Sequence, residues 1–399
     1  MIKKKLIIFT YSYPYDNAEK NFLKYEIDHL IKDFKKIEII PQKKTHNRKK
    51  KLKISNQIDI QYDLSEKINR FNVIKSLLSY TLLDINFWSE ISKVVFTGNF
   101  IAKSRMIILE SSISNIIFNW LKKNNYINEK NIFYSFWSNQ TLLVFNKLKS
   151  ENKKLIFISR TLGSDLNGFL KNDNYVPYLN KKFFSLNKVF VLADFQKKIL
   201  QKKQLIKKNK ISVCPLGIYK QKKIFTGFSP VDELRIVSCG SLIKIKNNFL
   251  MLKFLKEFCK FTNLQIKYYI IGKGPLEHSL KKEAKKNKMH FQTYFIKNIS
   301  SLPNFLSSKK IHFFLNFSSQ EGMSFSIMEA LSCGIPVIAS NIEANKNLVS
   351  EKSGYLFDLD KLDVSFKSLS KKITNDLRSN IYYKKKQLSY KFSNKSLIN

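Results

Sequence analysis

The first forty residues alternate two short apolar runs with an amphipathic stretch of helical length between them. The run LIIF is followed by residues 18–34, whose large apolar side chains recur at helical spacing, and the apolar run IEIIP comes next. In the stretch between the runs, one helical face carries Phe22, Ile27, Leu30, Ile31 and Phe34. Strand, helix and strand in this order predict a βαβ unit of a parallel sheet.

The same alternation continues along the chain in two blocks. A polar, turn-rich stretch from Tyr219 to Asp232 separates them, which predicts a domain boundary. Further strands are predicted at residues 131–137, 154–160, 188–195, 211–217, 234–240, 266–272, 290–295, 311–317 and 335–340. The pattern predicts the α/β class with two doubly wound domains, residues 1–218 and 219–380, and a C-terminal tail, 381–399, whose last helix packs back toward the N-terminal domain.

Composition excludes several classes of protein. With 399 residues, 44% of them hydrophobic, the chain has enough apolar surface for two ordinary cores, which excludes wholesale disorder. Four scattered cysteines without a CxxC pair argue against a disulfide framework or a structural zinc site and indicate a reducing compartment. The N-terminal apolar run is too short for a signal peptide and no run is long enough to span a bilayer, so we expect a cytoplasmic protein.

Net charge is the unusual quantity. The 71 Lys and Arg residues outnumber the 30 Asp and Glu residues, which leaves +41. Nucleic acid, an anionic bilayer and phosphorylated small substrates are the candidate partners, although an AT-rich genome also enriches lysine without any function. Because lysine reads bases and phosphates less well than arginine, its excess disfavours sequence-specific binding to nucleic acid.

Two basic segments are candidates for contact with an anionic membrane. Residues 43–53 hold a run of lysines, and in residues 195–210 the apolar Phe195, Ile199, Leu205 and Ile206 interleave with paired lysines. The second pattern is typical of an amphipathic helix at a bilayer surface. A solvated basic face with no membrane contact is the alternative.

The segment FSSQEGMSFSIMEALSCG carries the strongest chemical signal. Glu321 follows a predicted strand, and Glu329 falls about two turns into the predicted helix. Ligands of open α/β sheets bind at the carboxyl ends of the strands. The helix N-terminus would offer a diphosphate the amides of Gly322, Met323, Ser324 and Phe325. A capped helix with Glu329 merely solvated is the alternative.

This segment closely resembles the Glu-x7-Glu signature of the group 1 family of retaining, GT-B-fold glycosyltransferases. The resemblance extends to CGSLIKIKNNFLMLKFLKEF, IIGKGPLEHSL, LSCGIPVIAS and SGYLF, which are similar to the family's donor domain. In the first half, YSYPYDNAEKNFLKYEI, FYSFWSNQ and SRTLGSDLNGF are similar to the acceptor domain of members that build bacterial surface polysaccharides. The resemblance implies two Rossmann-like domains that face each other across a cleft.

The resemblance also implies roles for individual residues. Glu321 would contact the transferred sugar, Lys246 the donor diphosphate and Glu329 the nucleotide ribose, with Glu321 and Lys246 as the catalytic pair. Further contacts to the donor would come from Gly240, Ser241, Gly272, Gly322, Met323, Ser324 and Phe325. Contacts to the sugar or the acceptor would come from Arg160, Asp165 and Glu19. A turn-forming role for Asp165 and a helix-dipole role for Glu19 explain these two residues equally well.

Three positions depart from the family pattern. Leu162 stands where related sequences commonly have His, Ser241 stands where Arg is frequent, and Ser324 replaces a frequent Pro. Leucine can neither donate nor accept a hydrogen bond, and Ser241 removes one diphosphate contact, for which Lys244 could compensate. These departures keep open the alternative of a catalytically silent homologue that acts as a partner subunit.

The function implied by the resemblance is retaining transfer of a sugar from a UDP- or GDP-sugar to a glycan acceptor, carried on lipid. The product would be a bacterial polysaccharide, lipopolysaccharide or capsule, made on the inner face of the cell membrane. Because the sequence has no Asp-x-Asp element and no His and carboxylate cluster with ligand spacing, we expect no metal and no other cofactor. A basic nucleic-acid-binding protein is the alternative from another class, but we expect no nucleic acid partner because the aromatic residues fall within predicted strands and helices.

Overall fold

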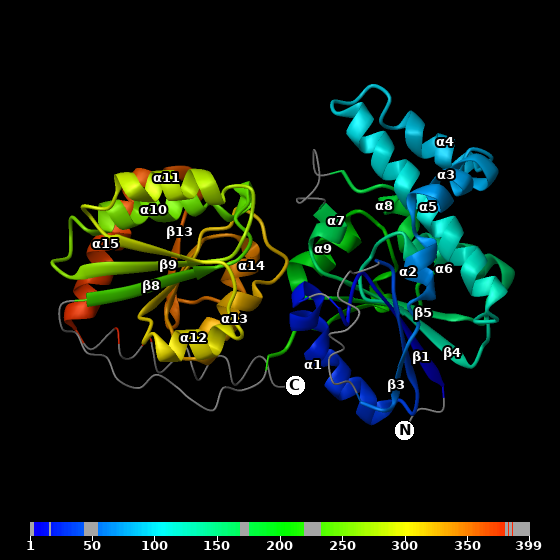
Figure 1. Cartoon of the computed structure of the whole chain (residues 1–399), viewed down its shortest axis with the longest axis horizontal. Coiled ribbons are helices and arrows are strands. Elements are labelled where there is room, and N and C mark those ends of the chain that lie inside the picture. Colours follow the sequence, from blue (N-terminus) through cyan, green and yellow to red (C-terminus); the bar gives the residue numbers. More distant parts are fainter. Residues whose placement is uncertain are drawn as a thin grey trace. The chain divides into compact units, whose positions relative to one another are not determined.

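The computed structural model describes residues 4–15, 17–43, 55–167, 175–218 and 233–379, together with Tyr382 and Lys385. The chain divides into two compact units, residues 1–216 and 217–399 (Figure 1). Three stretches of the sequence analysis lie outside the described residues: the boundary stretch from Tyr219 to Asp232, all of the first basic segment after Lys43, and most of the tail.

The N-terminal unit is built on a seven-stranded sheet in which every neighbouring pair is parallel. Its strand order is β3-β2-β1-β4-β5-β6-β7. The strands are β1 (Lys5–Thr10), β2 (Ile37–Pro41), β3 (Ile58–Ile60), β4 (Asn131–Ser135), β5 (Ile156–Thr161), β6 (Lys188–Val191) and β7 (Ile211–Val213). The chain moves outward from β1 to β3 and returns at β4 beside β1, so the order of winding reverses between β1 and β4.

Helices cover both faces of this sheet, as the continuously apolar strands require. Side chains of β1 alternate between two cores: Leu6 and Ile8 pack with residues of α1, and Ile7 and Phe9 pack with residues of α5 and α6. The helices are α1 (Asn17–Asp33), α2 (Asp63–Lys67), α3 (Arg70–Ser76), the π-helix η1 (Leu77–Thr81), α4 (Ile85–Ser92), α5 (Phe100–Lys123), α6 (Thr141–Glu151), α7 (Ser164–Asn167), α8 (Leu179–Lys182), α9 (Asp194–Lys202) and the short 3-10 helix η3 (Lys208–Lys210).

The C-terminal unit repeats this architecture with a six-stranded parallel sheet of order β10-β9-β8-β11-β12-β13. The strands are β8 (Glu233–Cys239), β9 (Gln265–Ile271), β10 (Gln292–Ile296), β11 (Phe313–Asn316), β12 (Val337–Ser340) and β13 (Gly354–Phe357). The helical segments are η4 (Lys244–Lys246), α10 (Asn248–Phe258), α11 (Glu277–Lys286), α12 (Leu302–Ser308), α13 (Phe325–Ser332), α14 (Glu343–Lys346), η5 (Leu359–Lys361) and α15 (Leu362–Arg378). Winding reverses between β8 and β11.

A cluster of aromatic rings fills the core on one face of this second sheet. Phe317 lies 4.4 Å from Phe357 and 5.6 Å from Phe254, measured between ring centroids, and Phe366 of α15 completes the group. Tyr382, one of the two described tail residues, joins the same core and donates a hydrogen bond of 3.0 Å to the His312 carbonyl. The predicted packing of the tail toward the N-terminal domain stays a prediction.

The predicted fold class, two doubly wound α/β domains, is confirmed. The structure adds the short strands β3 and β13, which the sequence analysis did not predict. It also shows the long stretch between β3 and β4 to be a succession of helices, α2 to α5.

Candidate active site

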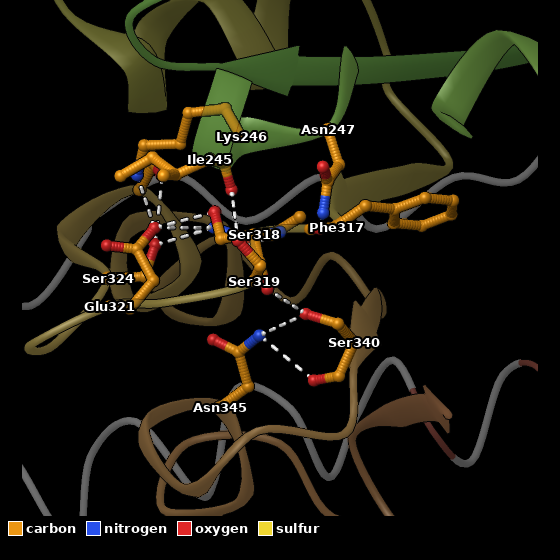
Figure 2. Close-up of polar contacts among 12 residues, drawn as sticks. Ile245, Lys246, Asn247, Phe317, Ser318, Ser319, Glu321, Ser324, Ser340 and Asn345 are labelled. Carbon is orange, nitrogen blue, oxygen red and sulfur yellow. Dashed lines mark hydrogen bonds and ion pairs between the residues drawn. The ribbon is translucent and has the colours of Figure 1, made fainter. Parts of the chain in front are cut away.

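The two residues with the strongest sequence signals meet at the point where winding reverses in the C-terminal unit. Lys246 lies in η4, just after β8, and Glu321 lies in the loop after β11. Because β8 and β11 are neighbouring parallel strands, their carboxyl ends lie side by side. The Lys246 ammonium pairs with the Glu321 carboxylate (Figure 2), and both side chains keep some contact with solvent.

Polar side chains at the end of β11 hold Glu321 in place. The Ser318 hydroxyl donates a hydrogen bond of 2.9 Å to Glu321 Oε1, the oxygen that also accepts from Lys246. Asn316 Nδ2 lies 3.4 Å from the same oxygen and donates at 2.9 Å to the hydroxyl of Ser324. Asn316 therefore links the end of the strand, the carboxylate and the start of α13.

The loop that carries Lys246 is fastened to the loop that carries Glu321. Asn247 adopts a left-handed backbone conformation, with φ of 50°, and its Nδ2 donates at 2.9 Å to the Phe317 carbonyl. The Ser319 amide donates at 2.9 Å to the Ile245 carbonyl. Asparagine tolerates the left-handed region better than most residues, so Asn247 both turns the chain and joins the loops (Figure 2).

Glycines allow the chain to pass closely beside this pair. Gly272 has a φ of +146°, and a Cβ there would lie 1.9 Å from the Gly240 carbonyl oxygen. At Gly274 a Cβ would lie 2.3 Å from the Leu242 carbonyl oxygen. Gly240 itself is open, with the Lys246 Cε at 3.9 Å from where a Cβ would be. Gly272 and Gly274 are thus required by backbone packing next to the loop of Lys246, while Gly240 leaves space beside the lysine.

The N-terminus of α13 lies next to Glu321. The helix begins at Phe325, and the hydroxyl of its N-cap residue, Ser324, is hydrogen-bonded to Asn316 and not to the helix amides. Within the described residues, no hydrogen bond uses the backbone amides of Gly322, Met323 or Ser324. Unused amides at a helix start, beside a lysine, form an arrangement that binds anions.

Glu329 lies one turn into α13 and faces a different environment. Burial raises the pKa of its carboxyl to about 7. The pKa of the Cys239 thiol, at the end of β8, is raised to about 12. Burial of the thiol is the main cause, and the nearby charge of Glu329 adds to it. Within the part of the chain that the structure describes, the Glu329 carboxylate makes no hydrogen bond or ion pair, so its hydrogen-bonding capacity is available to a ligand.

The predicted acceptor-side residues of the N-terminal unit lie inside polar networks. Glu19, in the first turn of α1, is buried and accepts hydrogen bonds from the backbone amides of Tyr11, Ser12 and Tyr13 and from the indole of Trp137. The loop after β1 and the loop after β4 are therefore joined through one carboxylate, at the reversal point of this sheet.

Arg160 and Asp165 also contact the protein itself. The buried Arg160 guanidinium donates at 2.7 Å to the Cys214 carbonyl and lies 3.1 Å from Glu26 Oε2. Asp165 accepts hydrogen bonds of 3.1 Å from the amides of Ser138 and Leu162. These contacts give both residues a role in shaping the loops at the strand ends, and a contact with an acceptor stays a prediction.

Residues 220–388 match the family model of glycosyl transferases group 1. This chain contains a group 1 glycosyltransferase domain. The Lys246 and Glu321 pair, the α13 N-terminus and Glu329 all lie inside the matched region.

Curated bacterial glycosyltransferases match part of the chain. The O-antigen biosynthesis glycosyltransferase WclY of Escherichia coli is 34% identical over 113 residues, 28% of this chain and 30% of the relative. An E. coli UDP-Gal:alpha-D-GlcNAc-diphosphoundecaprenol alpha-1,3-galactosyltransferase is 33% identical over 119 residues, 29% of this chain and 30% of the relative. The matched stretches thus span less than a third of these relatives' own length.

Solved glycosyltransferases share the fold over nearly the whole chain. A variant of S. aureus TarM, in complex with fondaparinux, alpha-GlcNAc-glycerol and UDP, has a TM-score of 0.68 at 11% identity, covering 99% of this chain and 97% of TarM. The apo lipopolysaccharide outer core galactosyltransferase WaaB has a TM-score of 0.60 at 14% identity, covering 98% of each chain. The group 1 domain and the N-terminal unit together have the GT-B fold.

Asn316, Ser318 and Asn247 are site residues of the group 1 domain that the sequence analysis missed. A polar residue that ends an otherwise apolar strand, as Asn316 ends FFLN, was the available signal. Nothing in the local pattern indicated a partner for Asn247, because Phe317 is 70 residues away. The partner of Ser318 is Glu321, three residues further along the same loop, but the sequence pattern does not show how that loop folds. Among the described residues, no group of three or more His, Cys, Asp or Glu side chains is placed to hold a metal ion.

Proposed function

We propose that this protein transfers a sugar from a nucleotide-sugar donor, bound by the group 1 domain, to a glycan acceptor bound by the N-terminal unit. The observation that carries this proposal is the Lys246 and Glu321 pair at the reversal point of the sheet, next to unused helix amides. The names of the E. coli relatives support synthesis of a bacterial surface polysaccharide of the O-antigen type.

In this mechanism the donor diphosphate displaces Glu321 from Lys246. The ammonium and the amides of residues 322–324 then face the phosphates, where they stabilise the negative charge that develops on the leaving nucleoside diphosphate. Glu321, released from the pair and still held by Ser318, accepts hydrogen bonds from hydroxyls of the transferred sugar. Glu329 accepts hydrogen bonds from the ribose.

Stereochemistry at the anomeric carbon is retained in the proposed reaction. The acceptor hydroxyl attacks from the face that the diphosphate leaves, and a phosphate oxygen takes its proton. The family resemblance supports this course, as it supports a metal-independent reaction in which Lys246 and the helix amides supply the positive charge at the diphosphate.

The acceptor is proposed to be a glycan on a lipid diphosphate, and the donor a UDP-sugar. Support comes from the E. coli galactosyltransferase relative, whose name includes UDP-Gal and a diphosphoundecaprenol acceptor. Leu162 packs with the apolar core around β1 and α1, so the position that carries His in related sequences is used here for packing. The proposal therefore requires turnover without a histidine at this position.

Donor-induced stabilisation tests the proposal directly. UDP-galactose, UDP-glucose, UDP-N-acetylglucosamine and the GDP-sugars are added to the full chain, and the melting temperature is measured with and without EDTA. At least one nucleotide sugar is expected to raise the melting temperature, because a ligand that binds only the folded state stabilises it, and EDTA should leave the shift and the transfer activity unchanged.

Matched lysine variants locate the donor in this assay. Lys246→Ala should lose most of the donor-induced shift. Lys253→Ala should keep it, because Lys253 forms an exposed ion pair with Asp363 away from the site. No response to any nucleotide sugar would contradict the proposed function, and a response that disappears with EDTA and returns with magnesium or manganese would contradict its metal independence.

Donor affinity is expected to rise with pH through the ionisation of Glu329. Its carboxyl, with a pKa of about 7, is mostly protonated at pH 6 and mostly ionised at pH 8. Ribose hydroxyls donate to the ionised form, so binding favours deprotonation and the affinity for the responding nucleotide sugar should increase about tenfold across this range. Nucleotide sugars suit this measurement because their diphosphate is a diester without the second phosphate pKa near 6.

Glu329→Gln is the control for this pH dependence. The amide does not ionise, so isothermal titration calorimetry should give weaker binding that changes little between pH 6 and pH 8. An affinity of the native chain that stays constant or falls over this range would show that Glu329 does not accept from the donor in its ionised form.

A further inference from the structure

The helices between β3 and β4 present an unusual number of apolar side chains to solvent. We define the apolar lobe as residues 70–105, which comprise α3, η1, α4 and the start of α5, and these helices lie together at one end of the N-terminal unit (Figure 1). Eleven of the nineteen large hydrophobic side chains that are exposed in the described residues belong to it, so the exposure is concentrated and not scattered. They are Phe71, Ile74, Leu78, Tyr80, Leu83, Ile85, Trp88, Val95, Phe96, Phe100 and Ile101.

The exposed side chains are not the ones that hold the lobe together. The helices α3, η1 and α4 pack against α5, and Phe87, Val94 and Ile107 form a small buried core with Tyr178. By contrast, Leu83, Ile85, Phe96 and Ile101 are 80% to 98% exposed. In α3 and η1, Phe71, Ile74 and Leu78 follow helical spacing, which places them on one outer face. The lobe thus has an internal core and a separate outer apolar surface.

The charges on this surface have one sign. Every exposed charged side chain between Lys67 and Leu109 is basic: Lys67, Arg70, Lys75, Lys93 and Arg105. The acidic residues of the stretch are used internally. Asp84 caps α4 by accepting from the Asn86 amide, and the buried Glu90 pairs with Lys93 and accepts from the amide of Tyr178.

A basic cavity borders the lobe. It has a volume of about 590 Å³ and is lined by Asp84 and Asn86 of the lobe and by Lys147, Lys149, Lys153 and Lys181. Lys181 donates a hydrogen bond of 2.7 Å to the side chain of Asn86, so the cavity wall and the lobe are connected. The positive surface therefore continues beyond the apolar residues onto α6 and α8.

We propose that the apolar lobe docks the protein onto an anionic lipid bilayer. Apolar and aromatic side chains on a lobe whose own exposed charges are all basic fit the boundary between acyl chains and anionic headgroups, and Trp and Tyr are favoured at that depth. A second copy of the chain would bring like charges together, and a nucleic acid would leave the apolar surface in water. We infer an interfacial contact from these surface side chains. No helix among the described residues is long and apolar enough to cross a bilayer.

The basic segment 195–210 does not provide such a surface. None of its apolar side chains is exposed: Leu200 and Leu205 are buried in the core, Ile206 packs against it, and Phe195 and Ile199 are half-buried. The amphipathic pattern of this segment is therefore explained by its packing on the N-terminal sheet. Its exposed lysines, Lys198, Lys202 and Lys203 among them, can add long-range attraction but no insertion.

This inference extends the proposed function. It rests on that function in one respect, because a lipid-linked acceptor is the reason for the protein to bind a bilayer. Vesicle binding is measured without any sugar transfer, so either proposal can fail while the other stands. The measurement uses the full chain and flotation with vesicles of phosphatidylcholine alone or with 30% phosphatidylglycerol. Binding is expected only to the anionic vesicles, with weakening as salt is raised.

Matched substitutions separate insertion from general charge. The triple variant Leu83→Gln, Ile85→Gln and Phe96→Gln should reduce partitioning into anionic vesicles at least tenfold. The double variant Met289→Gln and Val364→Gln, at exposed apolar positions of the C-terminal unit, should not. A cooperative melting transition and a far-UV circular dichroism spectrum like those of the native chain confirm that each variant is folded. Lys197→Gln, Lys198→Gln, Lys202→Gln and Lys203→Gln together should weaken binding at low salt more than at high salt.

Tryptophan fluorescence reports where the bilayer contacts the chain. Trp88 is half exposed in the lobe, whereas Trp120 is buried and Trp137 is partly buried and hydrogen-bonded to Glu19. Anionic vesicles should shift the emission to shorter wavelength, and brominated lipids should quench it. Both effects should disappear in Trp88→Phe.

Four results would overturn the proposal. The first is equal flotation of the native chain with neutral and anionic vesicles, and the second is unchanged partitioning of the triple variant. The third is the absence of vesicle binding together with self-association in the ultracentrifuge that the triple variant abolishes. The fourth is a preference for RNA over anionic vesicles at matched salt.

Discussion

Replacing Lys246 by alanine is expected to lower sugar transfer at least about 100-fold while the C-terminal unit stays folded. Lys246 is partly exposed and contributes no packing to the core, so its loss removes the charge that faces the leaving diphosphate and little else. The rate is measured with the donor that gives the largest melting shift, under conditions that saturate the native chain. Lys253→Ala is the matched control and should keep near-native transfer.

Glu321→Gln is expected to have a similar effect for a related reason. The glutamine side chain keeps the shape of the glutamate and can still accept a hydrogen bond from the Ser318 hydroxyl. It lacks the negative charge that pairs with Lys246 and that strengthens the hydrogen bonds donated by the sugar hydroxyls. Because the two residues act on one donor, the double variant should lose much less than the product of the single losses. Near-native turnover of either single variant with the true substrates would show that the site lies elsewhere.

The second large effect is on stability and concerns Glu19. Glu19→Ala should lower the free energy of unfolding of the N-terminal unit by about 3–5 kcal/mol, because several backbone amides and the Trp137 indole lose a buried, charged acceptor. Two units unfold in one chain, so a local probe is needed. Tryptophan fluorescence during urea unfolding provides it, because the three tryptophans of the sequence, Trp88, Trp120 and Trp137, all lie in residues 1–216 and Trp137 contacts Glu19.

Glu151→Ala is the matched control for this measurement. Glu151 forms an exposed ion pair with Lys122 in the same unit, and such pairs contribute about 0–1 kcal/mol. If Glu19→Ala left the tryptophan transition unchanged and reduced transfer instead, Glu19 would contact the acceptor and not support the loop. A loss of stability without any specific loss of donor binding is the expected outcome.

Much of the fold could be predicted because the strands are short and continuously apolar. A run such as LIIF or IPVIAS is buried on both faces of a parallel sheet, and this burial leaves a signal within a few residues. The helices α3 and α4 gave no such signal. Large apolar side chains of both helices, Phe71 and Ile85 among them, face solvent, so apolar positions do not mark the face that packs against the rest of the unit.

The sequence by itself determined the two-domain α/β class, because the alternation of short apolar runs and helical stretches is a local property. It also indicated the candidate site segment around Glu321 and Glu329 and, through the family resemblance, Lys246. Only the tertiary structure decided which groups meet. Lys246 and Glu321 are 75 residues apart, and Glu19 and Trp137 are 118 residues apart. Each pair forms because the winding of a sheet reverses there, which brings the ends of two strands distant in sequence side by side. Burial was also decided by the tertiary structure, which placed Leu200 and Leu205 of segment 195–210 in the core and left eleven large apolar side chains of the apolar lobe exposed.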